Sequence, residues 1–513
     1  MSEAPAPPPT SPVPTPPAAG RPTGPAGRPT AGGRPDGSAT AVDRSVAPVD
    51  RLAGLPAADR PTDPTDPTGP AGPVGPIDPI SPVDHTSPNS PVGPTGRPAF
   101  PERPALLVGV TLPDGRAADV RLRDGLVHAV EDHVPGRPLP PGALHLGGAL
   151  LLPALVDGHA HLDKTLLGAP WRPHRATATL REQIEAERAS RHTEDVPVAA
   201  RAAALARRMV SLGTGHVRSH VDVDPDTGLG RLHALLGVRE DFRDRLGIQL
   251  VAFPQSGVVT APGVADLLDA ALADGADLVG GLDPLGFDGD ADGQLDIVFG
   301  LAARHGKGID LHLHDGGEAG TAQLRDIAAR TAALGIGGTV AVSHAYALGE
   351  VDDAELDRTC AALAAAGVAI MTNGPSGPMP PVTRLREHGV LVFAGSDNIR
   401  DTWWPYGTAD MLERATVIGL RAGLMTDAEL AAAASLVTDA AAAALGLTGY
   451  GLAPGSRADL VAVAAGSVAE AVAAHPRRLL VLHAGRVVGP FADDPYPHPV
   501  PPSAPHPSAG AVR

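Results

Sequence analysis

Short apolar runs alternate with longer segments rich in Ala, Leu, Arg and Glu along residues 151–447. The runs have the length of buried strands. Several of the segments between them end in Gly, as helix C-termini do. The pattern predicts eight strands, at 154–162, 216–222, 248–255, 277–283, 309–314, 339–344, 368–372 and 390–397. Eight strand–helix units in about 300 residues predict an α/β fold, a (β/α)8 TIM-like barrel.

A doubly wound open sheet is the alternative arrangement of alternating strands and helices. Such a sheet carries a Gly-rich phosphate-binding turn after its first strand. No such turn follows residue 162. The barrel is therefore the favoured fold.

The segments on either side of the barrel have a different pattern of apolar and polar residues. Residues 105–150 and 448–492 contain short alternations of apolar and polar positions between turns, which is typical of antiparallel strands. We expect both to contribute to one small β-sandwich domain. Residues 1–104 hold 28 of the 56 prolines and show no apolar periodicity, so we expect a disordered tail there, and a second one at 493–513.

Composition excludes several classes of partner. The net charge of −17 leaves no basic stripe for nucleic acid. No run of about 18 apolar residues predicts a membrane span, and the N-terminus lacks the pattern of a secretion signal. The only cysteine, Cys360, cannot form an intrachain disulfide, which favours the cytoplasm. We expect a small-molecule substrate and leave homo-oligomerisation open.

Two histidines, His159 and His161, close the first predicted strand. Side chains at i and i+2 of a strand share one face, so both imidazoles can reach one point. His312 ends the fifth strand and Asp397 ends the eighth, and in a barrel these strand ends meet at one mouth. Three imidazoles and a carboxylate suit one divalent ion, Zn²⁺ or Fe²⁺.

Seven of the eight predicted strands end in polar or ionisable side chains, which favours an enzyme over a purely structural barrel. A divalent metal lowers the pKa of bound water and so makes a hydroxide nucleophile near neutral pH. His344, at the end of the sixth strand, is placed to hydrogen-bond that hydroxide. Asp397 can take the proton from the water.

Six motifs occur in a fixed order: GHAHLDKT, HVRSHVDVD, LVAFPQSG, IDLHLHD, VSHA and FAGSDNIRDTWWPYGTADML. They resemble the amidohydrolase superfamily, and within it the bacterial cytosine deaminase group. GLAPGSRADLV is similar to the segment with which amidohydrolases re-enter their β-sandwich, so the resemblance covers most of residues 105–490. It implies a metal-dependent hydrolase of non-peptide C–N bonds, an aminohydrolase that releases ammonia from a planar nitrogen heterocycle.

The resemblance also implies roles for individual residues. It matches His344 to the histidine beside the hydrolytic water, Gln255 to the amide that reads the substrate's edge, and Trp403 to an aromatic lining of the pocket. The metal ligands it implies are His159, His161, His312 and Asp397. Binuclear relatives carry a lysine at the end of the fourth strand; ADLVGGLDPLG has none, which favours a single metal ion.

The chain departs from the cytosine deaminase pattern at two places. Asp315 stands where a glutamate shuttles protons, so we assign the shuttle to Asp315, with Glu318 as the alternative. Asn398 replaces the second of two paired aspartates and cannot accept as an anion, which makes cytosine itself a doubtful substrate. His314 is interpreted as pocket lining, and the role of Lys164 stays open.

Two other functions remain compatible with the sequence. Hydrolysis of a cyclic or acyclic amide would give an acid and no ammonia. A barrel without catalysis could bind a metabolite, a reading motivated by Asp315 standing where glutamate is usual.

Overall fold

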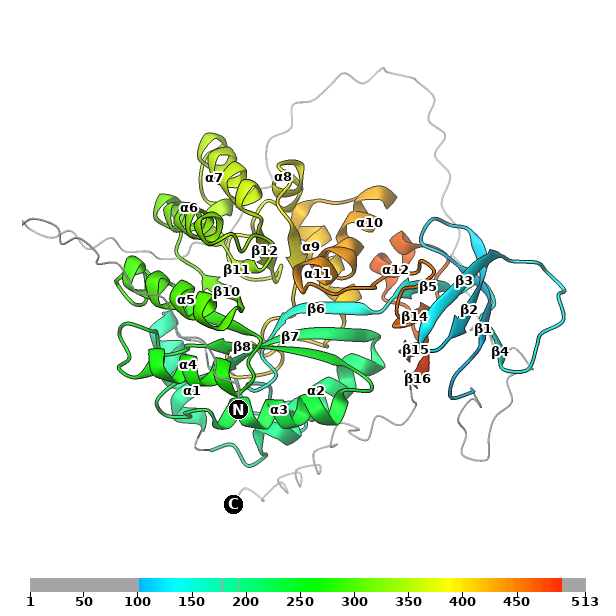
Figure 1. The fold of residues 1–513 in the computed structure, drawn as a ribbon, viewed down its shortest axis with the longest axis horizontal. Coiled ribbons are helices and arrows are strands. Elements are labelled where there is room, and N and C mark those ends of the chain that lie inside the picture. The colour runs from blue at the N-terminus through cyan, green and yellow to red at the C-terminus, as the bar shows by residue number, and fades with distance from the viewer. Residues whose placement is uncertain (1–100, 176, 178, 192, 491–513) are drawn as a thin grey trace, which may run out of the picture. The chain divides into compact units, whose positions relative to one another are not determined.

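The computed structural model describes residues 101–490 apart from 176, 178 and 192, so the predicted tails lie outside it except for residues 101–104. The described residues form two eight-stranded sheets (Figure 1). All pairs in one sheet are parallel and follow chain order. Its strands are β6 (Leu155–Ala160), β7 (Thr214–Asp222), β8 (Gly247–Phe253), β9 (Leu278–Leu282), β10 (Gly308–Leu313), β11 (Val340–His344), β12 (Val368–Thr372) and β13 (Val392–Ala394).

The last strand of this sheet returns to the first. Ala160 and Asp397 form a parallel bridge, and the Asp397 N–H donates to the His159 carbonyl at 2.8 Å. Gly395 allows this approach, because a Cβ there would lie 2.6 Å from the His159 backbone nitrogen. The predicted α/β barrel is confirmed, and the open sheet is excluded.

Helices connect and cover the barrel strands (Figure 1). Gly306, Gly335 and Gly367 end three of them in the left-handed conformation that glycine adopts without strain. The helices are α1 (Leu180–Arg191), α2 (Val198–Ser211), α3 (Gly230–Phe242), α4 (Val264–Asp274), α5 (Ala291–His305), α6 (Gly317–Leu334), the 3₁₀ turn η1 (Tyr346–Gly349), α7 (Asp353–Ala366), α8 (Val382–Glu387), α9 (Met411–Ala422), α10 (Asp427–Ser435) and α11 (Asp439–Ala444). Within the described residues, none of the helices combines the length and apolar character that crossing a bilayer requires.

The second sheet combines segments from before and after the barrel. Its order is β16-β15-β14-β5-β1-β2-β3, with β4 paired to β1, so β5 pairs antiparallel with β14 across the whole barrel sequence. The strands are β1 (Leu106–Thr111), β2 (Ala117–Arg123), β3 (Leu126–Asp132), β4 (Ala143–His145), β5 (Leu150–Pro153), β14 (Leu460–Val463), β15 (Arg478–His483) and β16 (Arg486–Gly489). A short helix, α12 (Val468–Ala474), interrupts the segment expected to be β. The residue boundaries assigned to the domains stay predictions.

Candidate metal centre and pocket

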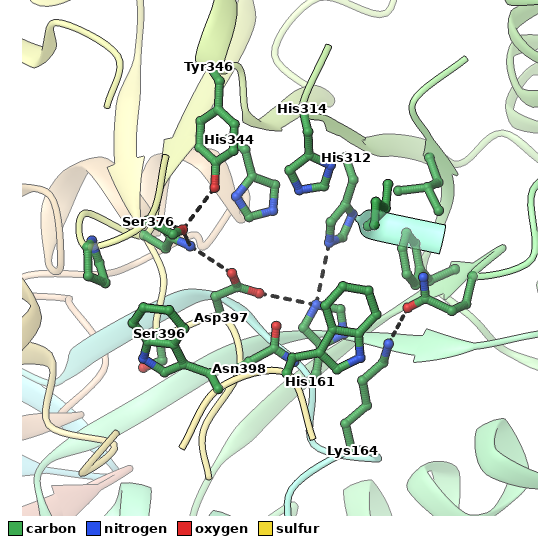
Figure 2. A pocket seen from close by; sticks show the side chains of 18 residues that line it. His161, Lys164, His312, His314, His344, Tyr346, Ser376, Ser396, Asp397 and Asn398 are labelled. Carbon is green, nitrogen blue, oxygen red and sulfur yellow. Dashed lines mark hydrogen bonds and ion pairs between the residues drawn. The ribbon is translucent and has the colours of Figure 1, made fainter. Parts of the chain in front are cut away.

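The four predicted metal ligands converge at the C-terminal mouth of the barrel. One ligand atom from each of His159, His161, His312 and Asp397 lies within 4.8 Å of all the others. Asp397 Oδ1 is 3.5 Å from His159 Nε2 and 3.3 Å from His161 Nε2. His312 Nε2 is 3.4 Å from His161 Nε2 (Figure 2). Three separate stretches of chain therefore meet at one point.

This donor set fits a divalent cation. Burial, together with neighbouring histidines, holds the pKa of His312 well below its usual value, so the ring keeps a free lone pair at neutral pH. Burial alone would raise the pKa of Asp397, but the adjacent imidazoles of His159 and His161 bring it well below its usual range. His159 Nε2 is buried and has no hydrogen-bond partner among the described residues. Neutral imidazoles and an ionised carboxylate are the forms that bind Zn²⁺-like metals.

A chain of hydrogen bonds fixes the ring of His159. Its Nδ1 donates to Ser343 Oγ at 2.9 Å, because the single hydroxyl proton of Ser343 is donated to Asp310 at 2.8 Å. Arg218 in turn donates to Asp310 at 2.9 Å. Such outer partners set the orientation of a metal-binding histidine. The sequence pattern did not reveal this chain of hydrogen bonds, although Ser343 stands in the VSHA motif.

A cavity of about 330 Å³ opens beside the four ligands (Figure 2). Most of the residues predicted for substrate and chemistry line it, and so does Lys164, whose role the sequence left open. The predicted residues on its wall are His161, Gln255, His312, His314, His344, Asp397, Asn398 and Trp403. Other residues on the same wall were not predicted from the sequence, namely Leu180, Phe253, Leu282, Tyr346, Pro375, Ser376, Ser396 and Trp404.

The rings of His344 and His314 stack on each other at the cavity wall, with centroids 4.4 Å apart. His314 Nδ1 is 2.9 Å from Asp283 Oδ2, so its Nε2 is the nitrogen left for the cavity. His344 has a backbone φ of 74° and Asp397 a φ of 60°. Positive φ values are energetically unfavourable for residues other than glycine, and they are common at functional sites. Burial and the charge of His314 keep the pKa of His344 well below its usual value.

The structure does not bring Asp315 to this cavity wall. Its Oδ2 accepts hydrogen bonds from the Gly286 N–H and from Gln323 Nε2, both at 2.9 Å. Glu318, the alternative shuttle, is exposed in the first turn of α6. His314 occupies the wall position that both carboxylates lack.

Gln255 and Asn398 present opposite hydrogen-bonding groups. Lys164 Nζ donates to Gln255 Oε1, and an ammonium has no acceptor, so the free group of Gln255 is its N–H donor. Asn398 Nδ2 donates to Asp401 Oδ2 at 2.7 Å, which leaves the Asn398 carbonyl as an acceptor. These two amides therefore offer one donor and one acceptor to the cavity.

A model of the Amidohydrolase family matches residues 144–489. N-isopropylammelide isopropyl amidohydrolase of Pseudomonas sp. (strain ADP) is 32% identical over 350 residues, which cover 66% of this chain and 86% of that protein. The pterin deaminase of Rhizobium rhizogenes is 29% identical over 409 residues, covering 74% of this chain and 91% of that protein.

Solved structures give the same picture. N-isopropylammelide isopropylaminohydrolase from Burkholderia multivorans superposes with a TM-score of 0.71 at 44% identity, over 75% of this chain and 97% of that chain. 5-Methylcytosine deaminase from Klebsiella pneumoniae superposes with a TM-score of 0.69 at 28% identity, over 76% of this chain and 98% of that chain.

Proposed function

Since this chain belongs to the amidohydrolase family and is a hydrolase of C–N bonds, we propose that it cleaves an exocyclic C–N bond of a planar nitrogen heterocycle and releases ammonia or an alkylamine. The observation that carries the proposal is the meeting of the four predicted ligands beside a cavity whose wall includes an amide donor and an amide acceptor. The relatives named above act on N-isopropylammelide, 5-methylcytosine and pterin, all of them such rings.

We assign one divalent ion, Zn²⁺ or Fe²⁺, to the four ligands. When bound, the ion supplies Lewis-acid chemistry and lowers the pKa of water toward neutrality. Asp397 Oδ2 is held by Asn373 Nδ2 at 2.7 Å, which keeps the carboxylate turned toward the reacting centre, where it accepts a proton from the attacking water. We assign His344 to hydrogen-bond the oxygen of this attacking water.

His314 donates the proton that the leaving nitrogen needs. Asp283 holds its Nδ1, so Nε2 faces the cavity, and the nearby carboxylate stabilises the protonated ring before transfer. In this assignment His314 takes the role that the sequence pattern gave to Asp315. General acids at such positions contribute about 10²–10⁴-fold to a rate.

The free hydrogen-bonding groups of the cavity wall indicate which substrate it recognises. The Gln255 N–H matches a ring carbonyl oxygen, and the Asn398 carbonyl matches a ring N–H, so the favoured ring carries an –NH–C(=O)– edge. The faces of Phe253 and Trp403 suit a flat ring. A ring with amino groups at both positions would leave buried polar groups unpaired and bind weakly.

The test is a substrate panel on metal-loaded protein, with N-isopropylammelide, 5-methylcytosine and cytosine as probes. We expect release of ammonia or amine from at least one ring that has the –NH–C(=O)– edge. Deamination exchanges NH for O, whereas ring opening adds one water molecule, so product mass separates deamination from amide hydrolysis. Tight binding without turnover would favour the metabolite-binding alternative.

The same proposal places the enzyme in the cytoplasm with a small-molecule substrate and without a nucleic-acid or membrane partner. Its support is the single cysteine and the net charge of −17.

A further inference from the structure

One face of helix α1 points toward the cavity. Leu180, Ile184, Glu187 and Arg191 follow one another at spacings of four, three and four residues, which places them on one side of the helix. Leu180 lines the cavity, and Ile184 packs in a cluster with Phe253. The charged residues Glu187 and Arg191 follow these apolar residues toward the C-terminal end of the helix.

Glu187 is 3% exposed and accepts hydrogen bonds from two residues of the cavity wall. Its Oε2 lies 3.1 Å from Lys164 Nζ and 2.5 Å from Trp403 Nε1. Its Oε1 lies 3.1 Å from Arg191 Nη2. Lys164 follows β6 and Trp403 follows β13, so one carboxylate ties the two closing edges of the barrel mouth to α1.

The position of Gln255 depends on the same contact. Lys164 Nζ donates to Gln255 Oε1 and lies 5.0 Å from the centre of the Trp403 ring. Without Glu187, the ammonium keeps Asp222 Oδ1 at 3.1 Å as its anionic partner and is drawn toward it. The Trp403 N–H would then be a partly buried donor that has lost its acceptor, a costly state that favours movement of the ring.

We propose that Glu187 is a positioning residue for substrate binding. It fixes the position of Lys164, and through it that of Gln255, relative to Trp403 on the cavity wall. The contacts stand independently of the reaction, but the substrate whose affinity they set is the one of the proposed function. Glu187 does not line the cavity and takes no part in bond breaking.

The kinetic test uses Glu187→Gln, with Glu185→Gln as the matched control, because Glu185 is an exposed residue of the same helix. On the substrate identified by the panel, we expect KM to rise about tenfold and kcat to change less than about threefold in Glu187→Gln. Glu185→Gln should behave as wild type. A fall in kcat at unchanged KM would overturn the proposal, because it would place Glu187 in the chemistry.

A second test needs no turnover. The chain has two lysines, Lys164 and Lys307, so Lys307 serves as an internal reference when a limiting amount of a succinimidyl ester acylates the protein. We expect the Lys164-to-Lys307 labelling ratio, read by peptide mass spectrometry, to increase several-fold in Glu187→Gln and to stay unchanged in Glu185→Gln. This ratio tests the positioning role even if wild type hydrolyses none of the probes. Failure of the proposed function can therefore be told apart from failure of the positioning proposal.

Glu187→Asp covers the case in which Glu187→Gln does not fold, as judged by its thermal melt. The shorter carboxylate keeps the charge but cannot reach both Lys164 and Trp403, so we expect a smaller change in the same direction. If folded Glu187→Asp has the same labelling ratio and the same KM as Glu185→Gln, the proposal is overturned.

Discussion

Two adjacent residues, His314 and Asp315, have different surroundings in this barrel. Side chains along a strand alternate between faces, so His312 and His314 share the inner side while Asp315 turns toward the Gly286 loop. The family pattern favoured Asp315 as the proton carrier, because it keeps a carboxylate at that position. Strand alternation favours His314, and the contacts agree with the alternation.

His314→Gln should therefore lower kcat about 100-fold, because the cavity loses its proton donor. Asp315→Asn should stay within about threefold of wild type, since the amide oxygen still accepts from the Gly286 N–H. Steady-state kinetics on the same substrate compares the two variants. The opposite ranking would restore the shuttle to Asp315.

Ser343 offers a second residue-scale prediction. Ser343→Ala removes the acceptor for His159 Nδ1 and leaves Asp310 without the hydroxyl proton. We expect metal affinity to fall about tenfold, as it does when outer partners of metal-binding histidines are removed. Competition with a chelator measures the dissociation constant. Ser435→Ala, at the half-buried end of α10 and outside the ligand set and the cavity wall, serves as the control. Equal affinities would show that the hydrogen-bond chain does not orient His159.

At the scale of elements, closure of the barrel depends on two small residues. Gly158 and Gly395 lie where β6 and β13 approach each other: a Cβ on Gly158 would lie 2.4 Å from the Phe393 ring. A Cβ on Gly395 would lie 2.5 Å from the Cβ of His159. Because His159 lies on β6 and Asp397 follows β13 by three residues, the spacing of the strands also sets the spacing of the ligands.

Gly395→Ala should destabilise the fold by about 1–3 kcal/mol, the usual cost of an added methyl in a full core. Gly300→Ala is the control, because Gly300 lies within α5 with open space around its Cβ position. There we expect no loss and up to about 1 kcal/mol of gain from helix propensity. Denaturant unfolding measures both. A neutral Gly395→Ala would mean that β13 can move away from β6.

At the scale of the whole molecule, the sequence predicted the barrel and the convergence of its four ligands well. Each barrel strand carries a local apolar run, and parallel strands bring their C-terminal ends together whatever lies between them. The sequence did not predict Glu187 or the Asp310–Ser343–His159 chain. Those contacts join residues distant along the chain, and no periodicity marks a buried charge whose partners lie on other elements.

Asp459 links the second sheet to the barrel and makes stability depend on pH. Its Oδ2 is 3.2 Å from His216 Nε2 and 2.7 Å from Arg457 Nε, and its Oδ1 accepts from the Ala484 N–H at 2.6 Å. Burial alone would raise the pKa of Asp459, but the hydrogen bond from His216 and the charges of His483 and Arg457 lower it to about 2. A folded pKa below the unfolded value of about 3.9 adds stability above pH 4 that is lost as pH falls toward 2.

Asp459→Asn should accordingly be less stable than wild type at neutral pH. The gap in unfolding free energy should narrow by about 1 kcal/mol between about pH 5 and about pH 3, because wild type alone loses this contribution. Denaturant titrations at each pH measure the gap. A gap that is constant with pH would show that Asp459 titrates normally in the folded protein.

The pairing of β5 with β14 has a consequence for biosynthesis. A ribosome completes β5 some 300 residues before it makes β14, so the N-terminal half of that sheet emerges with a leucine-rich edge that nothing yet covers. The nascent chain must keep this edge from pairing with other polypeptides until translation is nearly finished. Stalled or prematurely terminated products that stop before residue 460 would display the edge permanently, which exposes them to aggregation.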